Sequence, residues 1–322
     1  MIDVEVSPFE ERHAGVQVDL EARAFARVSA SARPRDSAEY LAHIHGPKNP
    51  AGCAWIAVAT EAGRPLGSAA ALPALFARKS GRILTGWQVG TFVVDAEQQG
   101  KGIGTALLEA LTDALKGREG AFLYSYPNRR SIGVFERHGY ARAGRTPTRI
   151  FLPARGPGEG FETRKIAREE LPSVLASIQA LPPTAGGFLR DAQTFAWRFG
   201  AQEAEGRYRF VRCGERDGAG AFVVALAAHR FAGLHFGVLA GACPDVLEHH
   251  LGTAVRAALA HGSSLLYATV TARPGSELPW SLTVPESRDP RPVVRVLHAG
   301  TAPDLFEEVA ASSVMTSDWG GF

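Results

Sequence analysis

Apolar and polar residues along the 322-residue chain follow the periods of strands and helices in alternation. Residues 83–94 form an apolar run rich in β-branched side chains, which predicts a buried strand, and residues 121–126 predict a second one. Between them, four leucines recur at helical spacing and predict a helix that buries one face: Leu107, Leu108, Leu111 and Leu115. Residues 53–60 and 66–76 flank a polar turn and predict a hairpin.

The same order of elements begins twice along the chain. Residues 1–152 give β, α, α, β, β, β, α, β, α, β, in which residues 142–152 supply the closing strands. Residues 153–160, PARGPGEG, have the composition of a linker. Residues 161–322 start on the same order, although the stretch after Trp280 is rich in turns and predicts no definite elements. We therefore predict an α/β fold of two tandem domains.

A glycine-rich turn joins the strand at 83–94 to the leucine-rich helix. Such a turn exposes unpaired N–H groups at the positive end of the helix dipole, and glycines let a phosphate approach. A P-loop requires Ser or Thr after Gly-Lys, but Gly102 follows Gly100-Lys101. A dinucleotide fingerprint requires a last glycine where Thr105 stands, and no acidic residue follows at the expected distance. A turn that binds no ligand is the remaining alternative.

Two motifs, in the right order and at a normal separation, resemble those of one family. Gln99, Gly102 and Gly104 form Q-x-x-G-x-G directly after a strand that ends in V-V-D. This resembles the pyrophosphate-binding signature of the GNAT superfamily, the acyl-CoA-dependent N-acyltransferases. The second motif of that superfamily, an Asn after a strand and then a helix that ends in Gly and an aromatic residue, is matched by Asn128, Ser131, Gly139 and Tyr140. The resemblance implies a GNAT domain over residues 1–152. It also implies, for both domains, an α/β (mixed α+β) fold with a mostly antiparallel twisted sheet flanked by helices.

The resemblance also implies an acyl-CoA site. Backbone groups of Phe92, Val93 and Val94 would pair with the pantetheine arm like an added strand, with their N–H groups facing the thioester carbonyl. The turn and the helix start would hold the pyrophosphate, through Gln99, Gly100, Lys101, Gly102, Ile103, Gly104 and Thr105. The second motif would add Asn128, Ser131 and Phe135. For the 3′-phosphate or the acceptor the candidates are Lys101, Arg129 and Arg130, and solvated helix-start charge is the alternative for the two arginines.

The sequence departs from the family at the proton donor. Many members carry a Tyr four positions before the Gly that ends the second helix, but here that residue is Phe135, and a phenyl ring cannot donate a proton. The candidate catalytic substitutes are Tyr126 and Tyr124, with His138 as a third, and packing or surface roles are the alternative for all three. The thiolate leaving unassisted is a further possibility.

The general base is left open. Family members often use a Glu on the fourth strand, where this chain has Gln88, Thr91 and, at the strand end, Asp95, which suits a turn better than catalysis. His43, His45, the second domain and a water chain are the other sources. Because His43 and His45 are two positions apart and point to different sides of a helix, we predict no metal site.

The second half lacks the phosphate motif. The turn over residues 240–244 has no Q-x-x-G-x-G and contains Pro244, which has no N–H group to donate. We expect residues 161–322 to be a degenerate GNAT-like domain that forms part of an acceptor cleft or an interface. Trp197, Arg198 and Phe199 form a W-R-aromatic element similar to one in bacterial acyltransferases of sugars or small metabolites, and a core role is as plausible for the two aromatic residues.

Composition excludes several classes of protein. A net charge of +2 gives no basic field for nucleic acid. The N-terminus has no apolar signal segment, and residues 219–243, the most apolar region, are interrupted by His229, Arg230 and His235, so no membrane partner is expected. Three cysteines, odd in number and far apart, argue against a disulfide framework and fit a reducing, cytoplasmic setting.

The expected function is transfer of an acetyl or other acyl group from CoA to an amine of a small-molecule acceptor, by direct attack in a ternary complex. Acetyl-CoA or another acyl-CoA is the co-substrate. One alternative is a non-catalytic CoA-binding sensor or structural subunit, motivated by Phe135 and the missing Glu. Another is a protein or peptide N-acetyltransferase, which the near-neutral composition does not favour. Monomer and homodimer both remain open.

Overall fold

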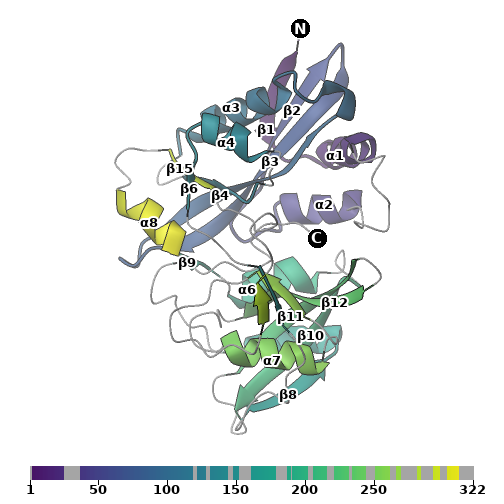
Figure 1. Cartoon of the computed structure of the whole chain (residues 1–322), viewed down its shortest axis with the longest axis vertical. Helices are drawn as coiled ribbons and strands as arrows, with labels where there is room; N and C mark the ends of the chain where they lie inside the picture. The colour runs from purple at the N-terminus through teal and green to yellow at the C-terminus, as the bar shows by residue number, and fades with distance from the viewer. Residues whose placement is uncertain are drawn as a thin grey trace.

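Figure 1 shows the computed structural model of the chain, in which two sheets with their helices lie one above the other. The structure describes residues 2–24, 37–118, 122–127, 131–143, 148–151, 161–178, 187–189, 191–201, 206–215, 221–231, 234–243, 251–261, 266–269, 281–283, 293–297 and 303–311. Within these ranges no helix has the length and apolar character needed to cross a bilayer.

The first sheet runs in the order β1-β2-β3-β4-β5-β15-β6. Its neighbours are antiparallel except for the parallel pair β4–β5. The strands are β1 (Asp3–Pro8), β2 (Trp55–Glu61), β3 (Arg64–Ala77), β4 (Ile83–Val94), β5 (Phe122–Ser125), β6 (Ala141–Arg142) and β15 (Val293–Val296). A short strand, β9 (Gly187–Phe188), pairs with the end of β3. The predicted strand at 83–94 and the predicted hairpin are confirmed.

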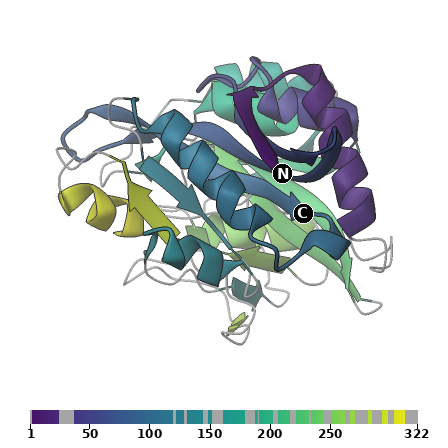
Figure 2. The ribbon, with the colours of Figure 1, turned by 90° about the horizontal axis from the view of Figure 1, so that it is seen from above.

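Helices cover both faces of this sheet, because successive residues of a strand point to opposite faces. Ala70 of β3 packs in a cluster with α1 (Glu11–Ala24) and α2 (Ala38–His45). The next residue on either side along β3, Ala69 and Ala71, packs with α3 (Ile103–Leu115) and α4 (Ile132–Arg137). Figure 2 shows α3 lying along the sheet. α2 begins at an N-cap, where Ser37 Oγ accepts a hydrogen bond from Tyr40 N–H at 3.2 Å.

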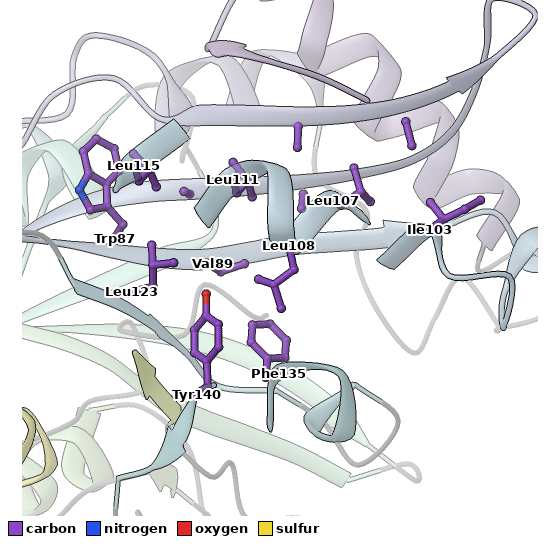
Figure 3. Packing of buried hydrophobic residues seen from close by; sticks show 14 of the residues in the cluster. Trp87, Val89, Ile103, Leu107, Leu108, Leu111, Leu115, Leu123, Phe135 and Tyr140 are labelled. Carbon is purple, nitrogen blue, oxygen red and sulfur yellow. The ribbon is translucent and has the colours of Figure 1, made fainter. Parts of the chain in front are cut away.

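The leucine stripe of α3 forms the centre of the first core. Leu107, Leu108, Leu111 and Leu115 are all fully buried, as their helical spacing predicts. Figure 3 shows them in one cluster with Trp87, Val89 and Leu123 of the sheet and with Phe135 and Tyr140 of the segment around α4. This packing fixes the start of α3 against the end of β4, where the predicted phosphate motif lies.

The second sheet runs in the order β14-β7-β13-β12-β11-β10-β8, again antiparallel except for one parallel pair, β12–β13. Its strands are β7 (Thr148–Phe151), β8 (Phe161–Ile166), β10 (Tyr208–Glu215), β11 (Phe222–Phe231), β12 (Leu234–Cys243), β13 (Leu266–Thr269) and β14 (Ser281–Thr283). The accompanying helices are α5 (Leu171–Ala176), α6 (Ala192–Phe195) and α7 (Leu251–His261), with short turns η2 (Arg168–Glu170) and η3 (Ala196–Gly200).

When the first sheet is followed from β1 and the second from β8, the two sheets have the same topology. One strand of each sheet, however, comes from the other half of the chain. β15 occupies in the first sheet the place that β7 occupies in the second, between the parallel pair's outer strand and the edge strand. The expectation that residues 142–152 close the first sheet therefore needs correction: β6 joins that sheet, but β7 hydrogen-bonds to β13 and β14 of the other. Periodicity predicts a strand but does not select its partner, which depends on contacts distant in sequence.

The two halves contact each other in further places. α8 (Pro303–Ala311), near the C-terminal end, packs on the first sheet, where Glu308 forms two hydrogen bonds with the Arg78 guanidinium at 3.0 and 3.1 Å. Phe188 of β9 stacks against Phe76 and Tyr124 of the first sheet. Figure 1 shows α2 between the two sheets.

Candidate functional site

Strands β4 and β5 part at the level of Val89. Their parallel pairing is confined to Gly86–Gln88 against Phe122–Tyr124. Ser125 Oγ then donates a 2.7 Å hydrogen bond to Val89 O, and beyond this point no described strand pairs with that edge of β4. On the opposite edge Val93 and Val94 still pair with β3. The backbone of residues 92–94 therefore has one edge in the sheet and one edge available for an extended ligand.

The same strand carries a bulge at Thr91. The register against β3 shifts between Ser68 and Ala70, and Thr91 has φ +45°, a left-handed conformation that is uncommon for a β-branched residue. A bulge redirects the strand and its side chains, and such strained positions cluster at functional sites.

The turn before α3 needs glycine for two different reasons. Gly100 and Gly102 both have φ +82°, which glycine adopts at little cost, and a Cβ on either would meet nothing within 4 Å. Gly104 has ordinary backbone angles, but a Cβ there would lie 3.1 Å from the Phe92 ring. The first two glycines thus shape an open turn, and the third lets the helix approach the strand.

The N-terminus of α3 points its donors into this turn. The first hydrogen bond of the helix runs from Ala106 N–H to Gly102 O at 3.0 Å, which leaves the N–H groups of Ile103, Gly104 and Thr105 outside the helical ladder. Gln99 Nε2 donates to Val94 O at 3.3 Å and Lys101 Nζ donates to Gln98 Oε1 at 3.0 Å. These two side chains therefore stabilise the turn through local hydrogen bonds. The geometry is that of an anion site beside a free strand edge.

Asp95 holds the exit of β4 in place. Its buried carboxylate accepts a hydrogen bond from Glu97 N–H at 3.2 Å and caps the short turn η1 (Ala96–Gln98). The same carboxylate lies 3.1 Å from Arg64 Nη2 and 3.3 Å from Arg23 Nε. These contacts agree with the predicted role of a turn residue.

The residues predicted to handle protons lie on opposite faces of the sheet. Phe135 is 1% exposed and packs between the rings of Phe92 and Tyr140 on the α3 face, so its ring is a core residue here. Tyr124 is buried and Tyr126 partly buried on the other face, where their rings meet edge to face at 6.1 Å. His138 Nδ1 lies 3.6 Å from Glu109 Oε1, away from this pair.

The second motif is described in part. Ser131 stands at the N-cap of α4, and Gly139 has φ +75° at the end of that helix, as the motif requires. Asn128, Arg129 and Arg130 lie outside the described residues. The linker at 153–160 and Pro244 lie outside them as well.

A pocket opens on the α2 face of β4, beside the bulge. Its wall includes Gln88, Gly90 and Thr91 of β4, Ala70 and Leu72 of β3, four residues of α2, and one residue from the second half, Arg198 of η3. The α2 residues are Tyr40, Leu41, Ile44 and His45. The sequence singles out the W-R-aromatic element but does not place Arg198 in a site of the first domain, because Arg198 and Thr91 are more than 100 positions apart in the chain.

The two candidate histidines of α2 have different surroundings. His45 Nε2 is 3.4 Å from Thr91 Oγ1, and burial together with the nearby Arg198 charge lowers the pKa of His45 to about 3. His45 is therefore neutral at physiological pH and is a weak proton acceptor. His43 instead points to the second half, where its Nε2 is 2.7 Å from Trp197 O.

The W-R-aromatic element links the halves. Trp197 Nε1 donates to His43 O at 3.4 Å, whereas Phe199 is buried in the core of the second half. Trp197 is thus an interface residue and Phe199 a core residue, and only Arg198 of the three lines the pocket. Within the described ranges no group of three or more His, Cys, Asp or Glu side chains is arranged to hold a metal ion.

Comparisons with known proteins identify the fold. The sequence model of the acetyltransferase (GNAT) family matches residues 19–140. A GCN5-related N-acetyltransferase structure from Anabaena variabilis is similar with a TM-score of 0.63 at 11% identity, covering 93% of this chain and 74% of that one. A probable N-acyltransferase of unknown function from Enterococcus faecalis gives 0.61 at 12% identity, covering 93% and 74%.

A tandem GNAT protein from the clavulanic acid biosynthesis pathway gives a TM-score of 0.51 at 15% identity, covering 92% of this chain and 99% of that one. No curated protein matches the chain. At these identities the solved structures establish the fold alone. The family match shows that residues 19–140 carry a GNAT acetyltransferase domain, and the solved structures show that the chain has the fold of GNAT proteins.

Proposed function

We propose that this protein transfers an acetyl group from acetyl-CoA to an amine of a small molecule held in the pocket beside Thr91. The family match supports acyl transfer from CoA in general. The observation that carries the proposal is the edge of β4 beyond Val89, with which no described strand pairs, next to an open glycine turn and the N-terminus of α3. One ligand that is extended at one end and anionic at the other fits this combination, and acyl-CoA has that form.

In this proposal the backbone of Phe92, Val93 and Val94 pairs with the pantetheine arm, and the N–H groups at the start of α3 bind the pyrophosphate. Gln99 and Lys101 keep the turn in shape through their contacts to Val94 and Gln98. The thioester then lies near the bulge at Thr91, and the pocket on the α2 face brings the acceptor amine to it. Holding both reactants together supplies much of the rate enhancement in such a transfer.

Proton transfers are proposed as follows. The amine attacks the thioester carbonyl as a free base, a C–N bond forms, the nitrogen releases one proton to water, the C–S bond breaks, and the thiolate of CoA takes up a proton. Tyr126 is our first candidate for that donor and Tyr124 the second. Tyr124 lies on β5, Tyr126 follows the end of that strand, and both pack on the sheet face opposite α3, whereas Phe135 packs in the core and has no proton to give. His45 serves better as a neutral hydrogen-bonding group than as the base, given its lowered pKa.

The second half would act as a wall of the acceptor site. We propose a GNAT domain in residues 1–152, a linker in 153–160, and a degenerate domain in 161–322 that contributes Arg198 to the pocket, with strands β7 and β15 exchanged between the two sheets. Among the described wall residues Arg198 is the one with a formal charge, and it is positive, which disfavours a basic peptide as the acceptor. A reducing, cytoplasmic setting stays a prediction from the cysteine pattern.

The test is release of free thiol from acetyl-CoA against a panel of small amines, amino sugars and a basic peptide. We expect turnover with small amines and none with the peptide. A Tyr126→Phe variant should bind acetyl-CoA normally in calorimetry and lose kcat, by about 100-fold if Tyr126 is the acid. CoA binding without turnover on the whole panel would instead support a sensor or structural subunit, and no CoA binding would refute the site.

A further inference from the structure

We propose that the acceptor is a small amine that also carries an anionic oxygen group, a carboxylate or a phosphate, and that Arg198 binds this group. The inference rests on the proposed function, because it names the class of acceptor for the same site. It follows from the charges and shapes around the pocket and from which half of the chain supplies them.

Arg198 reaches the pocket from outside the catalytic domain. It lies on η3, a π-helical turn that packs on α2 through Trp197, and its guanidinium carbon is 5.7 Å from the centre of the Trp197 ring. The bonds between Trp197 and His43 hold this turn against the last part of α2. Arg198 is therefore positioned by the interface between the halves, opposite β4 and the bulge.

The remaining wall offers hydrogen bonds and apolar surface but no described opposite charge. Tyr40, His45, Gln88 and Thr91 contribute neutral polar groups, and the other described wall residues are apolar or glycine. A second cation stands behind this wall, since Arg207 lies 3.8 Å from the centre of the Tyr40 ring. A protonated amine acceptor with no anionic group would therefore bring a second positive group beside the Arg198 guanidinium.

An anionic group on the acceptor resolves this conflict. A guanidinium presents a rigid fork of N–H donors that matches carboxylate and phosphate oxygens, and such charged hydrogen bonds are stronger than neutral ones. With its anionic end on Arg198, a small acceptor directs its other end toward Gly90 and Thr91, where the thioester is proposed to lie. The second half thus supplies specificity while the first supplies the CoA site.

The experiment compares matched acceptors that differ in one charge. Amino acids are measured against their amides, and phosphoethanolamine and glucosamine 6-phosphate against ethanolamine and glucosamine. We expect kcat/KM to favour the anionic member by about 10- to 100-fold in at least one pair, the range that a charged hydrogen bond supplies. The carboxylate and phosphate arms tell the two anion sources apart.

Three variants assign the preference to one side chain. Arg198→Met should raise KM for the anionic acceptor about 10- to 100-fold with kcat little changed, so that the preference over the neutral member is lost. Arg198→Lys should keep part of the preference. Arg209→Met removes an exposed cation of β10 that does not line the pocket, and should behave like the wild type. Thermal unfolding of all three checks that the fold is kept.

A binding readout separates this inference from the proposed function. Calorimetry with CoA present compares N-acetyl amino acids with their amides, and an N-acetyl phosphate compound with its unphosphorylated form, without any need for turnover. Tighter binding of an anionic compound that Arg198→Met abolishes supports the inference even if turnover fails. Three results would overturn the inference: equal binding of charged and neutral compounds, binding of neither, or equal losses of affinity in Arg198→Met and Arg209→Met. Turnover with neutral amines would still support the acyltransferase.

Discussion

The glycines before α3 are required for two different reasons, backbone conformation and close packing. Gly102 has φ +82° and open space where a Cβ would stand, whereas Gly104 meets the Phe92 ring there. In Gly102→Ala we expect the free energy of unfolding to fall by about 1–2 kcal/mol, because a residue with a Cβ is strained in the left-handed region. Acetyl-CoA affinity should also fall, on the order of tenfold, because the new methyl group projects into the phosphate site. Calorimetry and urea unfolding measure the two effects.

Gly81 provides the matched control for this prediction. It also has φ +82°, and a Cβ there would meet nothing within 4 Å, but it lies in the turn between β3 and β4, at the end of β4 remote from Val94. Gly81→Ala should lose similar stability and bind acetyl-CoA normally. If Gly102→Ala keeps full affinity, the turn does not bind the pyrophosphate.

His45 makes stability depend on pH in a predictable direction. Its folded pKa of about 3 is below the usual value near 6.5, so the unfolded chain takes up a proton that the folded chain does not. The stabilisation that neutral His45 contributes is fully present above about pH 6.5 and falls as the pH is lowered toward 3. The contribution of this one group between pH 7 and pH 5 is about 2 kcal/mol.

Urea unfolding at pH 7 and pH 5, for the wild type and His45→Gln, measures this contribution. The variant should lose about 2 kcal/mol less than the wild type over the same change in pH. Burial also lowers the pKa of His13, so this residue too makes the protein less stable at low pH. The contribution of His45 is therefore taken from the difference between the wild type and His45→Gln. Parallel pH profiles would mean that His45 is not buried as a neutral group.

The connection between β4 and α3 depends on Asp95, and this gives a test of its role. Asp95→Asn keeps an oxygen to accept from Glu97 N–H but removes the ion pairs with Arg23 and Arg64. Because both arginines are partly exposed and can be solvated, we expect a loss of only about 1 kcal/mol in the free energy of unfolding.

The same variant should keep kcat within about threefold at saturating acetyl-CoA, because a turn residue contributes no proton transfer. Loss of a general base would lower kcat by roughly 100- to 10,000-fold. A fall of that size with a small change in stability would make Asp95 the base and correct its assignment as a turn residue.

Elements with a strong local signal were predictable, and their partners were not. Two such signals are the β-branched run at 83–94 and the leucines of α3, which each fix a local conformation through neighbouring residues. Val293–Val296 also has the composition of a strand. The residues near it in sequence do not specify that it pairs with Tyr124 and Arg142 of the first half. The glycine turn was predicted for the same local reason, whereas Arg198 enters the pocket through contacts distant in sequence.

The exchange of β7 and β15 should make the two halves inseparable without denaturant. Each fragment, cut within 153–160, would keep an interior strand of the other's sheet: β7 lies between β13 and β14, and β15 between β5 and β6. Removing β15 would expose Val294, which is 1% exposed, and would leave ladder hydrogen bonds unmade on both sides. Loss of α8 would add the buried pair of Arg78 and Glu308.

We therefore expect a chain with a protease site inserted in 153–160 to elute after cleavage as one species in size-exclusion chromatography, and to separate into fragments only in urea. Residues 1–152 expressed alone should be insoluble or poorly folded, because β5 and β6 then lack the strand between them, and co-expression with the second fragment should restore them. Two cleaved fragments that separate in native buffer and each keep a cooperative unfolding transition would show that the exchanged strands contribute little, and that each half completes its sheet without the other.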